Sequence, residues 1–276
     1  MSDPHTPDER SFRALTAKIS RARGVSCDSY KDKCLKRRIA VRMRARGVHT
    51  FDDYAHLLDQ DAHDYELLLD ALTINVTKCW RNPETWSALA PILGSRWRAR
   101  AGRLVVWSAG CASGEEPYTI AVALAEAARA SGVGRPGDAR VTATDIDRVS
   151  LERAQAARFA AVAFSEMPAD LVQRYFEPPA PDGTRGPVAA VRSLVRILKH
   201  DLTRDPPPDP PYDLIVCRNV VIYFDRPTQE RLFASFAAAL VPDGILVLGK
   251  VETLLGPARD LLKLEDPRER IYRKPA

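Results

Sequence analysis

Residues 105–127 read VVWSAGCASGEEPYTIAVALAEA, and this stretch decides how the rest of the chain is interpreted. An apolar run ends at Gly110, a turn of small residues follows, and an apolar-periodic helix begins a few residues later. This layout usually delivers backbone N–H groups to a phosphate. Here the turn contains no lysine and ends in Glu115 and Glu116, whose carboxylates would repel a phosphate. The stretch therefore predicts a strand–turn–helix unit whose ligand is not held through phosphates.

The length and composition are those of an ordinary globular protein. A chain of 276 residues holds one large domain, or one domain and a small companion. No apolar run reaches the roughly 18 residues of a membrane helix, so we expect a cytoplasmic protein without direct membrane insertion. The 5 cysteines are scattered without a C-x-x-C pair, which predicts reduced thiols and no metal site.

The charge pattern favours an acidic partner. The net charge is +5 and the sequence pI is about 9.0. Much of the excess lies in KDKCLKRRIAVRMRAR (31–46), a predicted helix whose basic residues surround an apolar stripe of Leu35, Ile39 and Met43. A solvated helix face is one interpretation, and a docking surface is the other. We expect no nucleic-acid partner, because the segment lacks aromatic residues interleaved with the basic ones for base stacking.

The periodicity changes along the chain and predicts its organisation. Residues 1–76 have helical periodicity and are predicted to form a small helical domain, and 77–102 a linker helix that begins at Asn82-Pro83. From residue 103 to 276, short apolar runs alternate with helical segments. This alternation predicts an α/β domain with a doubly wound parallel sheet.

Polar residues follow the predicted strands. Ligands of such sheets bind beyond the carboxyl ends of the strands, so Gly110, Asp145, Asp201 and Arg218–Asn219 should converge. Asp145 is placed to hold ribose hydroxyls, although an aspartate there is often a turn residue. Glu115 could serve the helix dipole alone, which is worth about 0.3–1 kcal/mol. Together, a glycine turn, two acids and no phosphate-binding lysine indicate a cationic nucleoside, and S-adenosylmethionine is such a ligand.

A family resemblance rests on segments distributed over the chain. INVTKCWRN is followed, in order, by WSAGCASGEEPYTIA, ATDID, LVQRYF, CRNVVIYF and VPDGILVLG. Over roughly residues 10–274 the chain resembles CheR-type chemotaxis receptor glutamate O-methyltransferases. The resemblance implies a Rossmann-like class I methyltransferase domain with a small inserted subdomain near 176–195, and a substrate-docking function for the helical domain. It also implies a monomer that converts S-adenosylmethionine to S-adenosylhomocysteine while methylating the Glu-rich helices of a chemoreceptor or similar sensory protein.

The resemblance also implies roles for individual residues. It places Arg81 beside the cofactor and the reacting centre, where its planar guanidinium is our candidate for orienting the substrate carboxylate. It places Tyr223 facing the transferred methyl group, although a core aromatic is the alternative for that residue. The docking helix presents Arg37, Arg38 and Arg42. The residues that match the family's cofactor contacts are Asn75, Thr77, Arg81, Gly110, Glu115, Asp145, Asp201, Leu202, Arg218 and Asn219.

Three segments depart from the family pattern. Lys78-Cys79-Trp80 stands where a pair of phenylalanines is usual, Lys250-Val251 replaces His-Ser before Glu252, and EPPAPDGTRGPVAAV (177–191) occupies the place of a small β-subdomain. These departures leave two alternatives open. One is a cofactor-binding regulatory module without catalysis, and the other is a methyltransferase for another substrate, such as RNA or a small acid.

Overall fold

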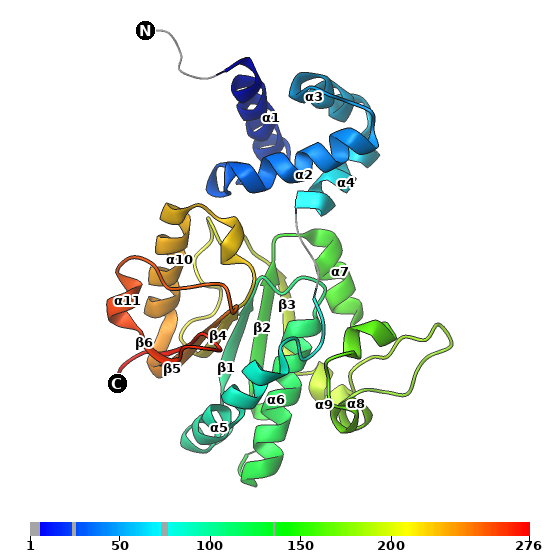
Figure 1. Cartoon of the computed structure of the whole chain (residues 1–276). Helices are drawn as coiled ribbons and strands as arrows, with labels where there is room; N and C mark the ends of the chain where they lie inside the picture. The colour runs from blue at the N-terminus through cyan, green and yellow to red at the C-terminus, as the bar shows by residue number, and fades with distance from the viewer. Residues whose placement is uncertain (1–5, 24–25, 73–76, 135) are drawn as a thin grey trace. The chain divides into compact units, whose positions relative to one another are not determined.

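A computed structural model describes residues 6–23, 26–72, 77–134 and 136–276, and the chain divides into two compact units (Figure 1). The first unit comprises the chain up to Ile74 together with the segment Tyr223–Thr228. The second comprises Asn75–Ile222 and Gln229–Ala276. The sequence interpretation places 223–228 in the methyltransferase domain, whereas the contacts of this segment assign it to the helical unit.

The first unit contains α1 (Pro7–Arg23), a 3₁₀ turn η1 (Cys27–Ser29), α2 (Asp32–Ala45), α3 (Phe51–Gln60) and α4 (Ala62–Leu72). The apolar stripes predicted from periodicity form its core, which includes Phe12, Leu15, Ile19, Leu35, Ile39, Met43, Tyr54 and Leu68. Thr50 caps α3, because its hydroxyl accepts the backbone N–H of Asp53 at 3.1 Å. The helical pattern of the N-terminal sequence is confirmed for these elements.

A buried carboxylate lies at the centre of this unit. Asp64 of α4 is fully buried, accepts a hydrogen bond from the Tyr54 hydroxyl at 2.8 Å and forms an ion pair with Arg42 of α2. Burial and the neighbouring Asp64 raise the pKa of Tyr54, so the phenol remains a donor. Three helices are therefore joined through one side chain.

We expect Asp64→Ala to destabilise the protein by about 3 kcal/mol, because it leaves the Arg42 guanidinium and the Tyr54 hydroxyl without their buried partner. Urea denaturation followed by circular dichroism measures the change. Asp59→Ala is the matched control, since Asp59 pairs with Lys18 while its side chain is 61% exposed. Equal, small losses in both variants would show that the buried network is not stabilising.

The second unit is built on a 7-stranded sheet in the order β3-β2-β1-β4-β5-β7-β6. The strands are β1 (Val105–Ala109), β2 (Arg140–Asp145), β3 (Val195–Lys199), β4 (Tyr212–Cys217), β5 (Leu240–Leu248), β6 (Lys263–Asp266) and β7 (Ile271–Arg273). β1 to β5 are parallel, and β7 pairs antiparallel with both β5 and β6. The predicted doubly wound α/β fold is confirmed, with a mixed sheet at one edge.

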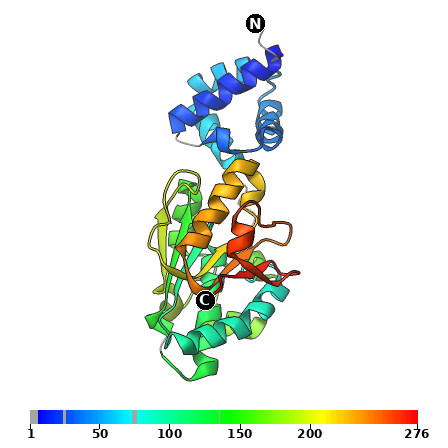
Figure 2. The same cartoon turned by 90° about the vertical axis from the view of Figure 1, so that its left-hand side faces the viewer.

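The longer helices cover both faces of this sheet. They are α5 (Pro83–Ala99), α6 (Glu115–Ser131), α7 (Arg148–Ala156) and α10 (Arg226–Ala239), accompanied by the shorter α8 (Ala169–Tyr175), α9 (Ala189–Arg192) and α11 (Ala258–Leu261). Val106 packs with apolar residues of α5 and α6. The ring of the next residue, Trp107, lies with its centre 5.4 Å from the ring centre of Phe236 in α10. Because successive strand residues point to opposite faces, α10 lies on the face opposite α5 and α6. Figures 1 and 2 show α10, coloured yellow to orange, alongside the sheet.

Two segments differ from their sequence-based description. The predicted linker helix is α5, and its Trp86, Leu89, Leu93 and Trp97 belong to the core of the sheet domain. Its C-terminal end is fixed by buried Asp213, which accepts from Arg96 at 2.8 Å and from the Val105 backbone at 3.0 Å. Near 176–195 the chain forms α9 and two isolated bridges, Phe159 with Arg185 and Phe176 with Pro187, before β3 begins. Residues 177–191 contain no β-strand.

Candidate active site

The turn after β1 is held at the end of β2. The backbone N–H groups of Gly110 and Cys111 both donate to the Thr144 carbonyl at 2.8 Å. Gly110 has φ 83°, and a Cβ atom there would lie 2.5 Å from Val220 in the loop after β4. The backbone of this turn therefore approaches the β4 loop as closely as only glycine permits.

Asp145 ends β2 and organises the same turn. One carboxylate oxygen accepts the Ala112 N–H at 2.8 Å, and the other accepts the Asp147 N–H at 3.0 Å. Burial raises the pKa of Asp145, and these two hydrogen bonds oppose the shift. Each oxygen keeps a second lone pair, so the carboxylate can still accept the two hydroxyls of a ribose.

The two glutamates that begin α6 have different surroundings. Glu115 is 9% exposed and accepts from the Ser113 hydroxyl at 2.7 Å. Burial raises its pKa, while the hydrogen bond from Ser113 and the positive charge of Arg153 lower it. A buried carboxylate with so few donors is suited to an ammonium group.

Glu116 is engaged inside the protein. It accepts from the Ser108 hydroxyl of β1 at 2.8 Å and lies 4.0 Å from Nη1 of Arg218. Burial raises the pKa of Glu116 to about 7, although the Arg218 charge opposes that shift. The sequence analysis assigned no role to Glu116. The feature that could have drawn attention to it is the pair of consecutive glutamates, Glu115 and Glu116, at the end of the turn.

Asp201 and Leu202, two of the predicted cofactor contacts, follow β3, next to the end of β2. The His200 N–H donates to the Asp145 carbonyl at 2.9 Å, which brings the two strand ends together. One Asp201 oxygen accepts from both the backbone N–H of Thr203 at 2.8 Å and its hydroxyl at 2.7 Å. Asp201 and Leu202 are both half-buried.

Glu252 holds the loops after β4 and β5, which sequence reasoning did not foresee. It is 2% exposed and accepts backbone N–H groups of Asn219 at 2.9 Å, Ile222 at 3.3 Å and Gly249 at 2.6 Å. Asn219 is thereby kept at a left-handed φ of 62°. Its side-chain oxygen is buried and has no hydrogen-bond partner among the described residues. That oxygen is available to a donor on a bound ligand.

Arg81 lies in a loop with unusual backbone geometry. Its neighbours Trp80 and Asn82 have φ of 60° and 59°. The Glu166 carboxylate accepts the Asn82 N–H at 2.8 Å and pairs with Lys78 at 3.3 Å. The first departure from the family pattern, at Lys78, therefore supplies an ion pair that anchors this loop.

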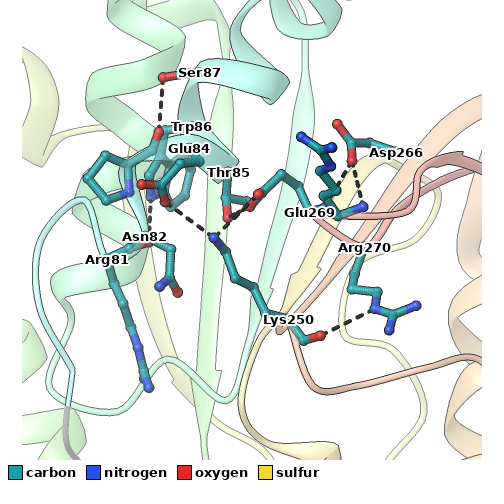
Figure 3. A network of polar contacts seen from close by, with 12 residues as sticks. Arg81, Asn82, Glu84, Thr85, Trp86, Ser87, Lys250, Asp266, Glu269 and Arg270 are labelled. Carbon is teal, nitrogen blue, oxygen red and sulfur yellow. Dashed lines mark hydrogen bonds and ion pairs between the residues drawn. The ribbon is translucent and has the colours of Figure 1, made fainter.

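The second departure is also an ion-pair residue. Lys250 lies 3.3 Å from both Glu84 and Glu269, and Thr85 donates to Glu269 at 2.5 Å. Figure 3 shows this network at the start of α5, with the Arg81 side chain directed away from it. Lys250 thus joins the β5 loop to the helix that follows Arg81.

Four predicted residues, Asn75, Thr77, Tyr223 and Arg38, have not yet been placed. Asn75 lies outside the described residues, and Thr77 is half-buried. Tyr223 belongs to the helical unit, where the Arg38 guanidinium lies 4.4 Å from the centre of its ring. Arg38 is only 6% exposed.

The exposed face of α2 differs from the predicted one. Arg42 is paired with Asp64, whereas Arg37 is exposed. The outward stripe of α2 consists of Lys33, Arg37, Val41 and Arg44, which follow one another at helical spacing. Two of the three arginines predicted for docking therefore have partners inside the unit.

Comparison with known proteins identifies the family. A family model described as the CheR methyltransferase SAM binding domain matches residues 75–269, and one described as the CheR methyltransferase all-alpha domain matches 10–73. The chain belongs to the CheR methyltransferase family. The second domain is thus an S-adenosylmethionine-binding methyltransferase domain, as the glycine turn and its acids predict.

Curated relatives agree with this assignment. The chemotaxis protein methyltransferase of Klebsiella aerogenes is 33% identical over 274 residues, which span 94% of this chain and 87% of that protein. That of Escherichia coli is 31% identical, with 91% and 85% covered, and that of Listeria monocytogenes is 32% identical, with 91% and 94% covered. Among the described residues, no helix combines the length and apolarity needed to cross a bilayer.

The residues at the strand ends fit S-adenosylmethionine. Glu115 is a buried carboxylate that would suit the cationic part of the molecule, and Asp145 retains acceptor capacity that ribose hydroxyls would use. The unpartnered oxygen of Asn219 and the close backbone approach at Gly110 lie on the neighbouring loops. The site thus combines acceptors and negative charge, as a cationic nucleoside requires.

We expect Asp145→Ala to weaken S-adenosylhomocysteine binding by at least about tenfold, because hydrogen bonds to a charged group contribute about 1.5–3 kcal/mol each. Isothermal titration calorimetry measures the affinity. Asp182→Ala, at an exposed loop aspartate, is the control and should bind normally. Unchanged affinity in Asp145→Ala, with a native circular dichroism spectrum, would remove Asp145 from the cofactor site.

Proposed function

We propose that this protein transfers a methyl group from S-adenosylmethionine to glutamate side chains of a chemoreceptor or related sensory protein, forming glutamyl methyl esters. The observation that supports this most directly is Arg81, a guanidinium carried on a rigidly held loop in the unit that contains Glu115 and Asp145. The names of the relatives, chemotaxis protein methyltransferases, favour the same substrate class.

The reaction requires orientation more than proton transfer. S-adenosylmethionine supplies the methyl group and leaves as S-adenosylhomocysteine. A glutamate carboxylate has a reference pKa of about 4.3, so it is already ionised at neutral pH and needs no general base. Positioning alone can supply about 7–11 kcal/mol toward the barrier. The protein's task is therefore to desolvate the carboxylate and direct one of its oxygens.

Arg81 and Tyr223 are the proposed catalytic residues. The planar Arg81 guanidinium can bind one carboxylate oxygen while the other remains directed at the methyl group. Tyr223 is held by the Arg38 guanidinium over its ring and by the Lys31 N–H, which donates to its carbonyl at 2.9 Å. In this arrangement Arg38 supports Tyr223, instead of forming part of an exposed docking surface.

The proposed docking surface is the outward stripe of α2. Lys33, Arg37 and Arg44 are exposed cations on that stripe, and Val41 is 50% exposed among them. A glutamate-rich receptor helix would carry the complementary charge, which speeds encounter and selects the partner. The internal partners of Arg38 and Arg42 exclude those two side chains from the exposed part of the stripe.

The departures from the family pattern do not favour a regulatory module without catalysis. Lys78 and Lys250 both form ion pairs that fix the segments on either side of Arg81. The two lysines therefore take part in the contacts around Arg81.

We expect Arg81→Lys to lower kcat at least tenfold, about 1.4 kcal/mol of transition-state stabilisation, because lysine keeps the charge but loses the planar fork. Incubation with labelled methyl donor and receptor fragments, scored as base-labile methyl ester, measures turnover. Arg98→Lys, at an exposed position of α5, is the control. Near-normal turnover in Arg81→Lys would assign the orienting role elsewhere, and wild-type protein that binds cofactor without turnover would favour the regulatory alternative.

Charge reversal at Arg37 and Arg44 together should raise KM for a Glu-rich receptor fragment several-fold at low salt and flatten its salt dependence, since screened attraction is lost. Affinity for S-adenosylhomocysteine should stay unchanged. The control carries the same reversals at Arg98 and Arg103, which are exposed near the amino ends of the strands. An unaltered salt dependence would show that this face of α2 is merely solvated.

A further inference from the structure

The sequence marks Arg218 as a cofactor contact, yet its side chain is directed to the protein. It is 2% exposed and follows β4, the central strand beside β1. Nη2 donates to the Arg81 carbonyl at 3.0 Å and to the Asn82 side-chain oxygen at 2.7 Å. The guanidinium thus contacts both residues at the point where the Arg81 loop becomes α5.

We infer that Arg218 is a positioning residue for Arg81: its guanidinium holds the 78–82 loop in the conformation that directs Arg81, and its side chain is not a cofactor ligand. The inference deepens the proposed function and rests on it for the role of Arg81 itself. It concerns contacts within the methyltransferase unit alone.

The Arg81 carbonyl is held by two donors. Besides the Arg218 guanidinium it accepts the Trp86 indole N–H at 3.1 Å, so both of its lone pairs are engaged. Arg81 and Trp86 are drawn in Figure 3. The Arg218 guanidinium in turn lies 5.7 Å from the centre of a Trp86 ring. Arg218 and Trp86 therefore fix the peptide plane that follows the Arg81 Cα, and with it the direction from which the side chain starts.

The contacts of Arg218 with the Arg81 carbonyl and the Asn82 side chain form a clamp on this loop. The backbone conformation explains why the loop needs it. Trp80 and Asn82 both have left-handed φ angles, which cost on the order of 1–3 kcal/mol each in a residue other than glycine. A segment of this kind persists only if its surroundings over-determine it. Arg218 binds it through the Arg81 carbonyl and the Asn82 side chain, and Glu166 binds it through the Asn82 N–H. Without these contacts the loop would relax toward ordinary φ angles and redirect Arg81.

The electrostatics agree with a structural position for the Arg218 charge. Burial lowers the pKa of Arg218, and the nearby Glu116 carboxylate opposes this shift. Glu116 is itself held by Ser108 of β1. A chain of polar contacts thus runs from β1 through Glu116 and Arg218 to the Arg81 loop. One atom, Nε of Arg218, has no hydrogen-bond partner among the described residues, and contact between the cofactor and that atom is the competing interpretation.

Arg218→Lys separates the two interpretations. As a positioning residue, its loss should lower kcat by about tenfold or more while affinity for S-adenosylhomocysteine changes no more than it does in Arg81→Lys. A weakened affinity with unchanged kcat at saturating cofactor would make Arg218 a ligand and overturn the inference. Arg196→Lys, on β3 with a 58% exposed side chain, is the matched control.

Substitutions of Asn82 test the same clamp from its other side. Asn82→Gly keeps the left-handed backbone and removes the acceptor, so kcat should fall, whereas Asn82→Asp keeps the acceptor and should retain activity. Combining Asn82→Gly with Arg218→Lys should lower kcat little more than Arg218→Lys alone does, because both substitutions remove the same hydrogen bond between Arg218 and Asn82. Additive losses, or equal activity in Asn82→Gly and Asn82→Asp, would contradict the clamp. These variants remain informative if Arg218→Lys folds poorly.

A readout independent of turnover comes from the tryptophan indoles. The Trp86 indole N–H donates to the Arg81 carbonyl, whereas those of Trp97 and Trp107 donate to Val133 and Thr144. In Arg218→Lys, the Trp86 indole N–H should exchange faster with solvent in heteronuclear NMR, with Trp97 and Trp107 unaffected as internal references. An unchanged Trp86 signal would overturn the inference. If the wild type methylates no receptor fragment, the proposed function fails while this measurement still decides the role of Arg218.

Discussion

The site is held together by carboxylates that accept backbone N–H groups from its loops. Asp145 binds the turn after β1, Glu252 binds the loops after β4 and β5, and Glu166 binds the Arg81 loop. Loops at the carboxyl ends of parallel strands expose N–H groups that no neighbouring strand can satisfy. A carboxylate has lone pairs for several of them and forms stronger hydrogen bonds than a neutral acceptor.

This construction has an electrostatic cost that the cations of the site offset. Burial raises the pKa of Glu116 and Glu252, so the negative charges are held in an unfavourable environment. Arg218 lies beside Glu116, and its charge favours the ionised carboxylate. A cationic cofactor would supply a further positive charge near Glu115. A phosphate at this turn would instead meet the negative charge of Glu115.

The local sequence pattern was sufficient to predict the helices and strands, and to predict residues whose position depends on a single turn or strand end. The apolar stripe of α2, the glycine turn at Gly110 and the position of Asp145 all follow from spacing. Pattern could not assign residues whose partners lie far away in the chain. Arg42 lies seven positions after Leu35, so periodicity puts it on the apolar face of α2 and Arg37 on the opposite face, but that spacing does not contain its pairing with Asp64, 22 positions later. Glu252 and Arg218 acquire their roles from contacts with other loops, which no local rule contains.

The surroundings of Arg81 suggest why polar contacts persist at both ends of α5. The helix that follows Arg81, α5, is tied to the sheet at its C-terminal end by Arg96 and Arg100 with Asp213. At its N-terminal end Arg218, Glu166 and Lys250 hold the residues around Arg81. Replacing a buried pair with apolar side chains is often neutral or stabilising, so such pairs are weak evidence of stability. Polar contacts differ from apolar contacts in being directional. An apolar contact lets the two groups slide and rotate, whereas hydrogen bonds to a carbonyl and to a side-chain amide restrict both the position and the orientation of the segment. A displacement of about 1 Å can cost two orders of magnitude in rate. If Arg81 has the proposed role, the polar contacts at the N-terminal end of α5 would serve its geometry, and apolar residues of the same size could not replace them in that task.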